Sequence, residues 1–418
     1  MSDDEVVRYV IIGGGLTAAR AVEGIREHDR EGAITVVSAE GHVPYERPPL
    51  SKDVLQGKAE ADVAYPHPEG WYGAEWVTLR LGQPATAISV DRHMVTLADG
   101  SDLPWDRLLL ATGSVVRRLD VTGGDLPGVH YLRTMDESLA LREQLRAGGD
   151  VVIVGAGWIG LEVAAAARHH GCTVTIVEPQ AAPLLGVVGE RIGAWFADFH
   201  RAQGVDVRLN TGVAGFTGDD HVTGVTTKDG ETIPATVVVV GVGIRPETAL
   251  AETAGVRIDN GVVTDAALRT SVPGIWAAGD VANWESTLLG RHVRVEHWAN
   301  ANDGGLAAGR SMAGVDLTYD PVPFFYSDQY DAGLEYAGYV PRDADAELIV
   351  RGDLAANEFM AFWVVPEGDG VRVLAGMHVN VWDTIDAVQS LIREGTVVSR
   401  ERLADASIAL DEVAAGPS

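Results

Sequence analysis

The stretch PYERPPLSK, residues 44–52, ends in a lysine whose position indicates chemistry. The chain has only three lysines among its 32 basic residues, so arginine supplies nearly all of its positive charge. A lysine ammonium is a compact charge, whereas an arginine guanidinium is broad. We therefore expect Lys52 to place a small cation at a reacting group. The prolines before it predict an extended segment, and Ser51 is a candidate N-cap for a helix that begins at SKDVL.

Two glycine patterns have the spacing that binds dinucleotide phosphates, and each lies between an apolar strand and a helical segment. They are YVIIGGGLTAARAVEGIRE, with Gly13, Gly15 and Ala18, and VVIVGAGWIGLEVAAAARHHGCTVTIVE, with Gly155, Gly157 and Gly160. The first small residue permits a tight turn, the second lets the backbone approach a pyrophosphate, and the third lets helix pack on strand. One such pattern is weak evidence because glycine also marks turns. Two complete patterns predict two dinucleotide sites.

An acidic residue closes the second predicted strand of each unit. AITVVSAE ends in Glu40 and TVTIVE ends in Glu178, where a carboxylate can accept hydrogen bonds from a ribose. At the second site a carboxylate favours NADH over NADPH, and no basic residue follows Glu178 before Arg191. A solvated acid at a strand end is the alternative for Glu178. The economical interpretation is FAD in the first unit and NADH in the second, because hydride passing between them is a complete reaction.

Three further apolar segments end in small residues as expected for strands that approach a nucleotide. They are RLLLATGS with Ala111, Thr112 and Gly113, TVVVVGVGIRP with Gly241 and Gly243, and GIWAAGDVANW with Gly279 and Asp280. The first two follow stretches with an Asp-Gly signal, ADGSDLPWD and KDGETIPA, which predict hairpins. Asp280 is expected either to cap a helix or to accept hydrogen bonds from the ribityl chain of FAD.

Length and charge limit the classes of protein. The 418 residues predict two or three domains at roughly 100–200 residues each. Asp and Glu outnumber Lys and Arg by 60 to 32, and the net charge of −28 argues against nucleic acid or anionic lipid as a partner. No apolar run approaches the ~20 residues that span a membrane. The acidic start MSDDEVV is not typical of a secretory signal, so we expect a cytoplasmic protein without membrane insertion.

Cysteine and histidine usage predicts neither a disulfide nor a metal site. The lone cysteine, Cys172, excludes an intramolecular disulfide and is expected to be a small buried residue near a strand start. The 12 histidines form no HExxH pattern, and no cysteine pairs accompany them. His169 and His170 are typical of a solvated helix end.

These segments together resemble the pyridine nucleotide-disulfide oxidoreductase superfamily and, within it, the NADH-dependent ferredoxin reductases of oxygenase systems. The resemblance rests on PYERPPLSK, VGAGWIGLEVAAAA, LRT, AAGDVA, VEHWANA and FFYSDQY, in the order of the family. Apoptosis-inducing-factor-like NADH oxidoreductases share many of these motifs. The resemblance implies an α/β fold like that of glutathione reductase, with two Rossmann-like domains and a smaller αβ C-terminal domain. The implied domains are 1–112 with 243–320 for FAD, 113–242 for NADH, and 321–418 at the C-terminus.

The resemblance also implies roles for individual residues. Lys52 would approach the reactive flavin nitrogen and pair with Glu162, although an ordinary surface lysine with Glu162 near a helix end is the alternative. Arg133 would contact the FAD pyrophosphate or form a surface ion pair, and Trp298 would lie beside the flavin or fill core. The remaining implied contacts are backbone contacts to FAD from Thr17 and Ala85, an NADH contact from Ile159, and a phosphate or partner contact from Arg47.

The absence of a cysteine pair bears on the electron acceptor. Disulfide reductases of the superfamily carry a CxxxxC pair where this chain has PYERPPLSK, so electrons are expected to leave the flavin for an external acceptor. The favoured acceptor is an iron–sulfur ferredoxin that serves a monooxygenase or dioxygenase. The alternatives are reduction of quinone or oxygen, and an NADH-sensing flavoprotein scaffold.

The net charge of −28 cannot attract an acidic ferredoxin, so we expect a local patch of arginines where it docks. The candidates for this patch are Arg291 and Arg294, together with Arg47 or Arg310. A monomer or weak homodimer is expected.

Overall fold

Two parallel sheets of five strands organise the chain, one in each of the two units into which it divides. The computed structural model describes residues 6–413, so the first five residues of MSDDEVV and residues 414–418 lie outside the described part. The first unit contains the chain up to Val43, Glu69–Gly113 and the chain from Thr248 onward. The second contains Pro44–Pro68 and Ser114–Glu247. The segment with Lys52 therefore belongs to the second unit.

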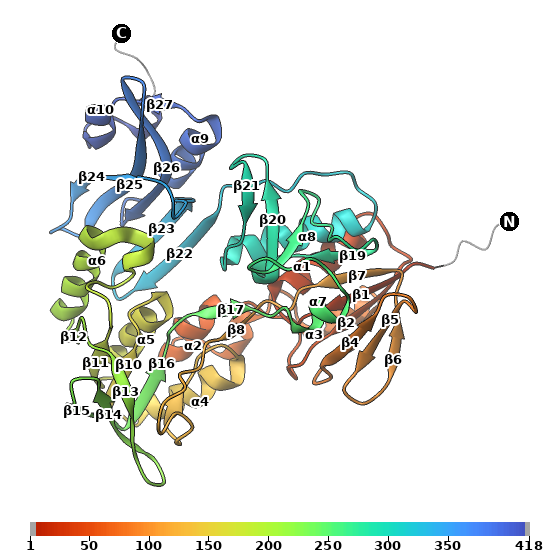
Figure 1. Ribbon diagram of the computed structural model, residues 1–418, viewed down its shortest axis with the longest axis horizontal. Coiled ribbons are helices and arrows are strands. Elements are labelled where there is room, and N and C mark those ends of the chain that lie inside the picture. The colour runs from red at the N-terminus through yellow and green to blue at the C-terminus, as the bar shows by residue number, and fades with distance from the viewer. Residues whose placement is uncertain (1–5, 414–418) are drawn as a thin grey trace. The chain divides into compact units, whose positions relative to one another are not determined.

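The first parallel sheet has the strand order β19-β7-β1-β2-β3. Its strands are β1 (Arg8–Ile12), β2 (Ala33–Val37), β3 (Val77–Arg80), β7 (Arg107–Leu110) and β19 (Ile275–Ala277). β1 pairs in parallel with both β2 and β7, and its residues Val10, Ile11 and Ile12 are buried in succession. Such continuous burial is typical of a parallel sheet with both faces covered. The helix α1 (Leu16–Arg26) connects β1 to β2 (Figure 1).

The second parallel sheet repeats this arrangement with the order β12-β11-β10-β16-β9. Its strands are β9 (Val129–His130), β10 (Asp150–Val154), β11 (Thr173–Val177), β12 (Asp206–Arg208) and β16 (Val237–Val240). The helices of this unit are α2 (Asp53–Gln56), α4 (Met135–Arg146), α5 (Trp158–His169) and α6 (Leu185–Ala202). The helix α5 connects β10 to β11 as α1 connects β1 to β2, so both predicted strand–glycine–helix–strand units are confirmed.

Each unit carries a small antiparallel sheet that contains one of the predicted hairpins. The strands are β4 (Ala85–Ser89), β5 (Met94–Leu97) and β6 (Asp102–Pro104) in the first, and β13 (Val213–Gly218), β14 (Val222–Thr227) and β15 (Thr232–Pro234) in the second. The turn glycines Gly100 and Gly230 have φ of +83° and +87°. Left-handed backbone of this kind is the reason that the Asp-Gly signal predicts a turn.

Short connecting elements complete the two units. The second unit has the 3-10 helices η1 (Pro48–Ser51) and η2 (Ala61–Ala64) and a two-stranded sheet of β8 (Ser114–Val116) with β17 (Ile244–Pro246). The first unit has α3 (Glu69–Ala74), α7 (Ala249–Thr253), η3 (Gly279–Val281), and a sheet of β18 (Val262–Thr264), β20 (Ala282–Ser286) and β21 (Arg291–Val293).

The long helix α8 (Trp298–Met312) packs directly on α1 in the first unit. Glycines permit this close contact: a Cβ on Gly305 would lie 2.5 Å from the carbonyl oxygen of Thr17, and one on Gly309 would lie 2.2 Å from that of Ala21. Side chains larger than hydrogen at these positions would separate the two helices.

The C-terminal part of the first unit is an antiparallel sheet covered by a helix. Its strands are β22 (Phe324–Gln329), β23 (Ala332–Gly338), β24 (Glu347–Asp353), β25 (Glu358–Glu367), β26 (Gly370–Val379) and β27 (Val397–Val398). The helices are α9 (Ile385–Glu394), α10 (Arg400–Ala404) and the 3-10 helix η4 (Leu410–Glu412). The smaller αβ domain that the resemblance implied at the C-terminus is present, and the α/β fold class is confirmed.

No helix within residues 6–413 is long and apolar enough to cross a membrane.

Candidate functional site

The first glycine loop is closed by contact with a neighbouring strand. Gly13 has φ of +143°, and a Cβ there would lie 2.0 Å from the carbonyl oxygen of Ala111, which follows β7. The Gly13 N–H donates to the carbonyl of Val37 at 2.8 Å. Gly15 is the N-cap of α1, and the third small residue, Ala18, is fully buried. The loop thus presents backbone rather than side chains at the start of α1, as a pyrophosphate site requires.

The second glycine loop has the same construction. Gly155 has φ of +101°, and a Cβ there would lie 2.4 Å from the carbonyl oxygen of Gly241, which follows β16. A Cβ on Gly160 would lie 2.1 Å from the carbonyl oxygen of Gly155. At Gly157, the N-cap of α5, a Cβ would have no heavy atom of the described residues within 4 Å. This open space over a glycine at a helix start fits a dinucleotide phosphate.

The turn that follows β7 in the first unit and the turn that follows β16 in the second unit have similar backbone conformations. Gly113 and Gly243 have φ of +67° and +98°, so both positions adopt left-handed backbone. Thr112 lies between Ala111 and Gly113 in the first turn. These predicted cofactor residues lie at the carboxyl ends of the parallel strands, where ligands of such sheets bind.

The two strand-end acids are not equivalent, contrary to the sequence prediction. Gly13 bonds to Val37 and Gly155 bonds to Val177 in the same way, so the counterpart of Glu178 is Ser38. The strand β2 ends at Val37, and Glu40 lies three residues beyond it, half-exposed. The prediction that this strand runs to Glu40 was wrong.

Glu178 is tied to the second glycine loop. It is 5 % exposed, and its Oε2 accepts a hydrogen bond from the Ala156 N–H at 2.7 Å while Oε1 accepts from the Gln180 N–H at 2.9 Å. It is therefore not a solvated acid at a strand end. Ser38 makes the corresponding local bond in the first unit, because its Oγ accepts from the Glu40 N–H at 3.1 Å. A carboxylate beside a glycine loop can contact a ribose and repel an added phosphate.

Lys52 and Glu162 form a nearly buried ion pair within the second unit. The Lys52 Nζ donates to Glu162 Oε1 at 2.8 Å, and the two side chains are 12 % and 4 % exposed. Lys52 is thus not an ordinary surface lysine. The structure brings this pair together from η1–α2 and from α5, although 110 residues separate the partners.

The lead-in to Lys52 differs from the prediction. The prolines form the 3-10 helix η1 rather than an extended segment, since the φ that proline imposes suits both conformations. The N-cap of α2 is Lys52 and not Ser51. Instead, the Ser51 Oγ donates to Glu162 Oε2 at 2.5 Å. The capping prediction was wrong because a distant carboxylate is the partner of this hydroxyl.

Arg47 and Arg133 lie together in the second unit. The guanidinium of Arg47 donates to the carbonyl of Arg133 and lies 5.3 Å from the ring centre of Tyr45. The Arg133 Nε donates to the carbonyl of Ser114 at 3.1 Å. Both arginines are half-buried, and their predicted contacts with phosphate remain predictions.

A second group of predicted residues lies around the start of α1 in the first unit. A Cβ on Gly279 would lie 2.5 Å from the Thr17 Oγ1, which places η3 against the first turn of α1. The N-cap of η3 is Ala278, so the alternative that Asp280 caps a helix was wrong. Trp298 begins α8, and its ring meets that of Tyr326 edge to face at 6.3 Å.

Sequence reasoning missed His297, the N-cap of α8. Burial lowers the pKa of His297 to about 4, against the opposing effect of the Asp280 carboxylate. Its Nδ1 is buried without a hydrogen-bond partner among residues 6–413, and its ring lies 4.8 Å from that of Phe325. An unpaired buried nitrogen beside predicted FAD residues fits a site that a polar ligand completes. The motif VEHWANA contains this residue, but its spacing did not reveal the burial.

Two predicted contact residues occupy less enclosed positions. Ala85 begins β4 and is half-buried. Ile159 lies in the first turn of α5 and is 42 % exposed, which makes it one of the few large apolar side chains on the surface.

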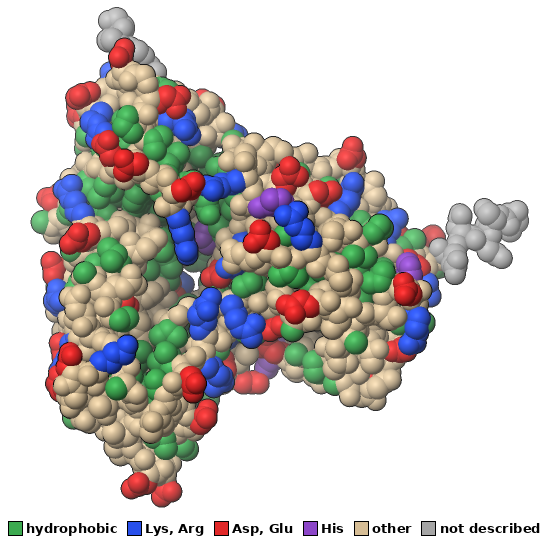
Figure 2. Space-filling model, in the orientation of Figure 1, with side chains coloured by type: hydrophobic (Ala, Val, Ile, Leu, Met, Phe, Trp, Pro, Cys, Tyr) green, Lys and Arg blue, Asp and Glu red, His purple; other side chains and the backbone are tan. Residues whose placement is uncertain are grey.

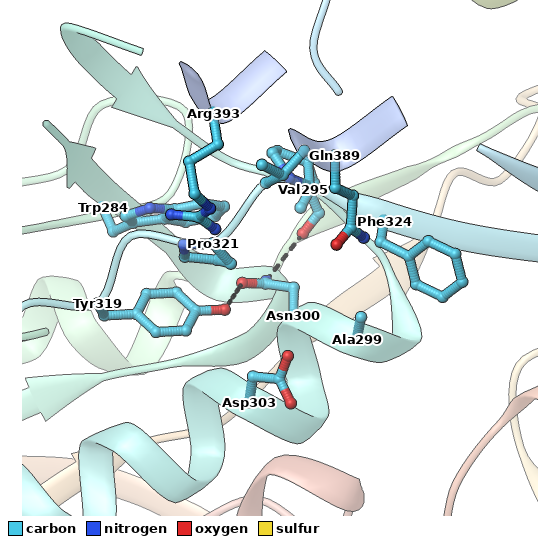
Figure 3. A pocket seen from close by; sticks show the side chains of 12 residues that line it. Trp284, Val295, Ala299, Asn300, Asp303, Tyr319, Pro321, Phe324, Gln389 and Arg393 are labelled. Carbon is cyan, nitrogen blue, oxygen red and sulfur yellow. Dashed lines mark hydrogen bonds between the residues drawn. The ribbon is translucent and has the colours of Figure 1, made fainter. Parts of the chain in front are cut away.

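A separate cavity of about 220 Å³ lies between α8 and α9 in the first unit (Figure 3). The Tyr319 hydroxyl donates to Asn300 Oδ1 at 3.0 Å, and Asn300 Nδ2 donates to the Val295 carbonyl at 3.2 Å. Asp303 and Arg393 also line the cavity. Its lining includes none of the predicted cofactor residues.

The candidate arginine patch is largely neutralised by neighbouring carboxylates. Arg294 pairs with Glu296 at 2.8 Å and Arg310 pairs with Glu27 at 2.5 Å. Arg291 has a looser contact of 3.4 Å with an Asp343 oxygen. On the face drawn in Figure 2, acidic side chains are spread over the surface with basic ones among them. Arg291 is therefore the better candidate of the two predicted patch residues.

Cysteine and metal-ligand chemistry add little to the site. Cys172 is buried, its Sγ donates to the Leu145 carbonyl at 3.3 Å, and burial raises the pKa of its thiol. Within residues 6–413, no group of three or more His, Cys, Asp or Glu side chains is placed to hold a metal ion.

Comparison with known proteins gives consistent results over nearly the whole chain. The family model described as pyridine nucleotide-disulphide oxidoreductase matches residues 7–305, and the reductase C-terminal model matches residues 324–414. The ferredoxin–NAD(+) reductase component of the anthranilate 1,2-dioxygenase system of Burkholderia cepacia is 38 % identical, over 96 % of this chain and 98 % of the relative.

Solved structures show the same similarity. A ferredoxin reductase from Rhodopseudomonas palustris is 33 % identical with a TM-score of 0.91, over 98 % of this chain and 100 % of that one. The covalent putidaredoxin reductase–putidaredoxin complex contains a chain that is 37 % identical with a TM-score of 0.92, over 97 % of this chain and 98 % of that one.

Proposed function

Because the chain belongs to the pyridine nucleotide-disulphide oxidoreductase family, we propose that it is the NADH-dependent ferredoxin reductase of an oxygenase system. It uses FAD and NAD(H), and bound FAD supplies the exchange between a two-electron donor and a one-electron acceptor. The observation that carries the proposal is the buried Lys52–Glu162 pair in a chain with two glycine loops of the same construction and a single cysteine. One cysteine cannot form the redox disulfide of a disulfide reductase.

The two glycine loops have different ligands in this proposal. The loop at Gly13 holds FAD, and the loop at Gly155 holds NADH beside Glu178. We keep the domain division expected from the sequence as part of this proposal, with FAD bound by 1–112 and 243–320 and NADH bound by 113–242, although Pro44–Pro68 belongs to the second compact unit. The C-terminal domain, 321–418, contributes to ferredoxin docking. The remaining proposed contacts with FAD come from Gly15, Thr17, Ala18, Glu40, Arg47, Ala85, Ala111, Thr112, Gly113, Arg133, Gly279, Asp280 and Trp298, and those with NADH come from Gly157, Ile159, Gly160, Gly241 and Gly243.

Lys52 supplies positive charge to the flavin as negative charge develops there. A preorganised donor in a water-poor site stabilises such charge more strongly than solvent does, because it does not reorganise during the reaction. Glu162 fixes the ammonium through the 2.8 Å contact. Lys52→Met should therefore keep FAD and slow flavin reduction by NADH by about 10²-fold, the order expected on removing one such donor. Reduction at the wild-type rate would contradict this role.

Electrons then leave singly for an iron–sulfur ferredoxin that feeds a monooxygenase or dioxygenase. The solved complex of the similar putidaredoxin reductase with putidaredoxin supports this partner class. Transient redox interfaces are small, below about 1,200 Å² in total, and depend on local charge. The enzyme acts in the cytoplasm as a monomer or weak homodimer.

The deciding experiment is stopped-flow reduction by NADH followed by mixing with ferredoxins, quinones and oxygen. We expect turnover with ferredoxin to exceed turnover with quinone or oxygen and to fall as the salt concentration rises, while the rate of ferricyanide reduction changes much less.

Arg291→Glu should raise the ferredoxin KM and leave reduction of the flavin by NADH intact. Adding Arg294→Glu should raise this KM by a smaller further amount, because Arg294 already pairs with Glu296. If quinone or oxygen is the best acceptor, the chain is an apoptosis-inducing-factor-like oxidoreductase. Slow turnover with a long-lived reduced complex would favour the sensing scaffold.

A further inference from the structure

Ser51 provides the second hydrogen bond to the carboxylate that holds Lys52. The Ser51 Oγ donates to Glu162 Oε2 at 2.5 Å, while the Lys52 Nζ donates to Oε1 at 2.8 Å. Ser51 is 3 % exposed and Glu162 is 4 % exposed. Each carboxylate oxygen therefore has its own donor, and the two donors come from consecutive residues.

The local backbone explains how neighbouring side chains reach one carboxylate. The helix η1 ends at Ser51 and α2 begins at Asp53. Between them Lys52 leaves helical conformation, with φ of −117° and ψ of −113°. This break directs both side chains toward α5, which carries Glu162. The Ser51 hydroxyl is 3.5 Å from the Pro48 carbonyl, a distance at which that alternative bond is weak.

We propose that Ser51 is a positioning residue for Lys52. The terminal torsion of a glutamate side chain is broad, so each hydrogen bond that the carboxylate accepts restricts the rotation of its plane. A second, charge-assisted hydrogen bond fixes that plane and with it the place of the ammonium. The kinetic consequence rests on the proposed function, in which Lys52 acts on the flavin. Ser51 itself touches neither nucleotide in this scheme.

A neighbouring serine provides a matched control. Ser138 is fully buried, and its Oγ donates to the Leu50 carbonyl at 2.7 Å, so it holds the same η1 segment without contacting Glu162. Ser138→Ala should disturb the segment and leave the carboxylate in place. A purely structural role for Ser51 would make the two serine variants alike.

The first measurement is anaerobic single-turnover reduction of the flavin by NADH in the holoenzyme. Ser51→Ala should slow this step about tenfold, the order expected from one buried hydrogen bond to a charged group. The Kd for NADH should stay unchanged. Ser51→Thr should restore the rate because it keeps the hydroxyl, and Ser138→Ala should react at the wild-type rate. Ser51→Cys, a weak donor of similar size, gives the same test if the alanine variant does not fold.

The second measurement is independent of the flavin reaction. Amine acylation followed by mass spectrometry reports the three lysines separately, and the exposed Lys58 and Lys228 serve as internal references. Ser51→Ala should raise acylation of Lys52 relative to both by at least about threefold, because its ammonium is held less firmly. Ser51→Thr and Ser138→Ala should show the wild-type ratio.

The two measurements separate failure of the inference from failure of the proposed function. If Lys52→Met reduces its flavin normally, the proposed role of Lys52 fails, and the acylation ratio alone decides whether Ser51 positions it. If Lys52→Met is slow but Ser51→Ala matches the wild type in rate and acylation, the inference is overturned. Equal slowing by Ser51→Ala and Ser138→Ala with an unchanged acylation ratio would also overturn it.

Discussion

The two glycine loops have the same backbone construction, but the helices that follow them have different neighbours. In both units a glycine with positive φ meets the carbonyl of the next strand, at Ala111 in the first and Gly241 in the second. The helix α1 then packs on α8 through glycine contacts. The helix α5 instead packs on η1 and α2 and carries Glu162 toward Lys52. The same backbone construction is thus followed in one unit by a helix that packs closely on another helix, and in the other unit by a helix that carries one member of a charged pair.

The residue after the second strand sharpens the contrast. Ser38 and Glu178 occupy the same structural position, and each accepts a hydrogen bond from the main chain two residues later. Only Glu178 also reaches the N–H of its own glycine loop, at Ala156, among the bonds of the described residues. The side chain beside the glycine loop is therefore an uncharged serine in the first unit and a charged glutamate in the second.

The largest expected effect comes from breaking the shared construction. Both glycines have positive φ. The Cβ of Gly13→Val would lie 2.0 Å from the Ala111 carbonyl oxygen, and that of Gly155→Val would lie 2.4 Å from the Gly241 carbonyl oxygen. Each should lower the free energy of unfolding by at least about 3 kcal/mol and abolish binding of its own nucleotide. Denaturant titration and flavin content measure these losses. Gly157→Ala, where a Cβ has open space, should fold normally, and equal instability of all three variants would contradict this account.

The next largest effect is the pH dependence of stability that arises from His297, the N-cap of α8. Burial lowers the pKa of His297 from the 6.5 of an ordinary imidazole to about 4, so the unfolded chain binds more protons than the folded one between these two pH values. The free energy of unfolding should therefore fall as pH drops from 6.5 to 4, by up to about 3 kcal/mol, and this contribution is fully present above pH 6.5.

Urea denaturation of His297→Asn at both ends of this window checks the assignment. The variant should lose this part of the pH dependence. Burial also lowers the pKa of His130 in the second unit, so His130→Gln is the matched control and should retain the His297 contribution. An unchanged slope in His297→Asn would show that another group titrates.

A smaller effect is expected on nucleotide preference. We expect the wild type to favour NADH over NADPH by at least roughly a hundredfold in kcat/KM, because Glu178 repels the added phosphate. Glu178→Ala should narrow the ratio about tenfold, which corresponds to about 1.4 kcal/mol, chiefly by weakening NADH binding. Steady-state kinetics with both nucleotides measure the ratio. Equal efficiency of the wild type with the two nucleotides would refute the role of Glu178.

The smallest effect is expected at the corresponding position of the first unit. Ser38→Ala removes the bond to the Glu40 N–H and should cost about 1 kcal/mol of stability or FAD affinity. The ratio of NADH to NADPH efficiency should not change. Release of FAD during dilution and the kinetic ratio together test this. A changed nucleotide preference in Ser38→Ala would contradict the assignment of the two loops.

The sequence by itself determined the two nucleotide-binding units, because strand, glycine turn and helix are specified by residues within about 20 positions of one another. Asp-Gly hairpins at Gly100 and Gly230 follow the same local rule. The αβ character of the C-terminal domain came from the resemblance to a family, and the pairing of its strands into one antiparallel sheet is seen only in the structure. The pairing of Lys52 with Glu162 was available only through the resemblance to a family, since 110 residues separate them.

Only the tertiary structure decided how these local units use their side chains. The prolines before Lys52 permit an extended segment or a 3-10 helix, and packing selected the helix. Ser51 has the sequence signature of an N-cap, but a carboxylate from α5 competes successfully for its hydroxyl. Glu40 and Ser38 are two residues apart, so only the pairing of β2 with β1 shows which one matches Glu178. Hydrogen-bond partners and burial depend on distant parts of the chain, and no local pattern specifies them.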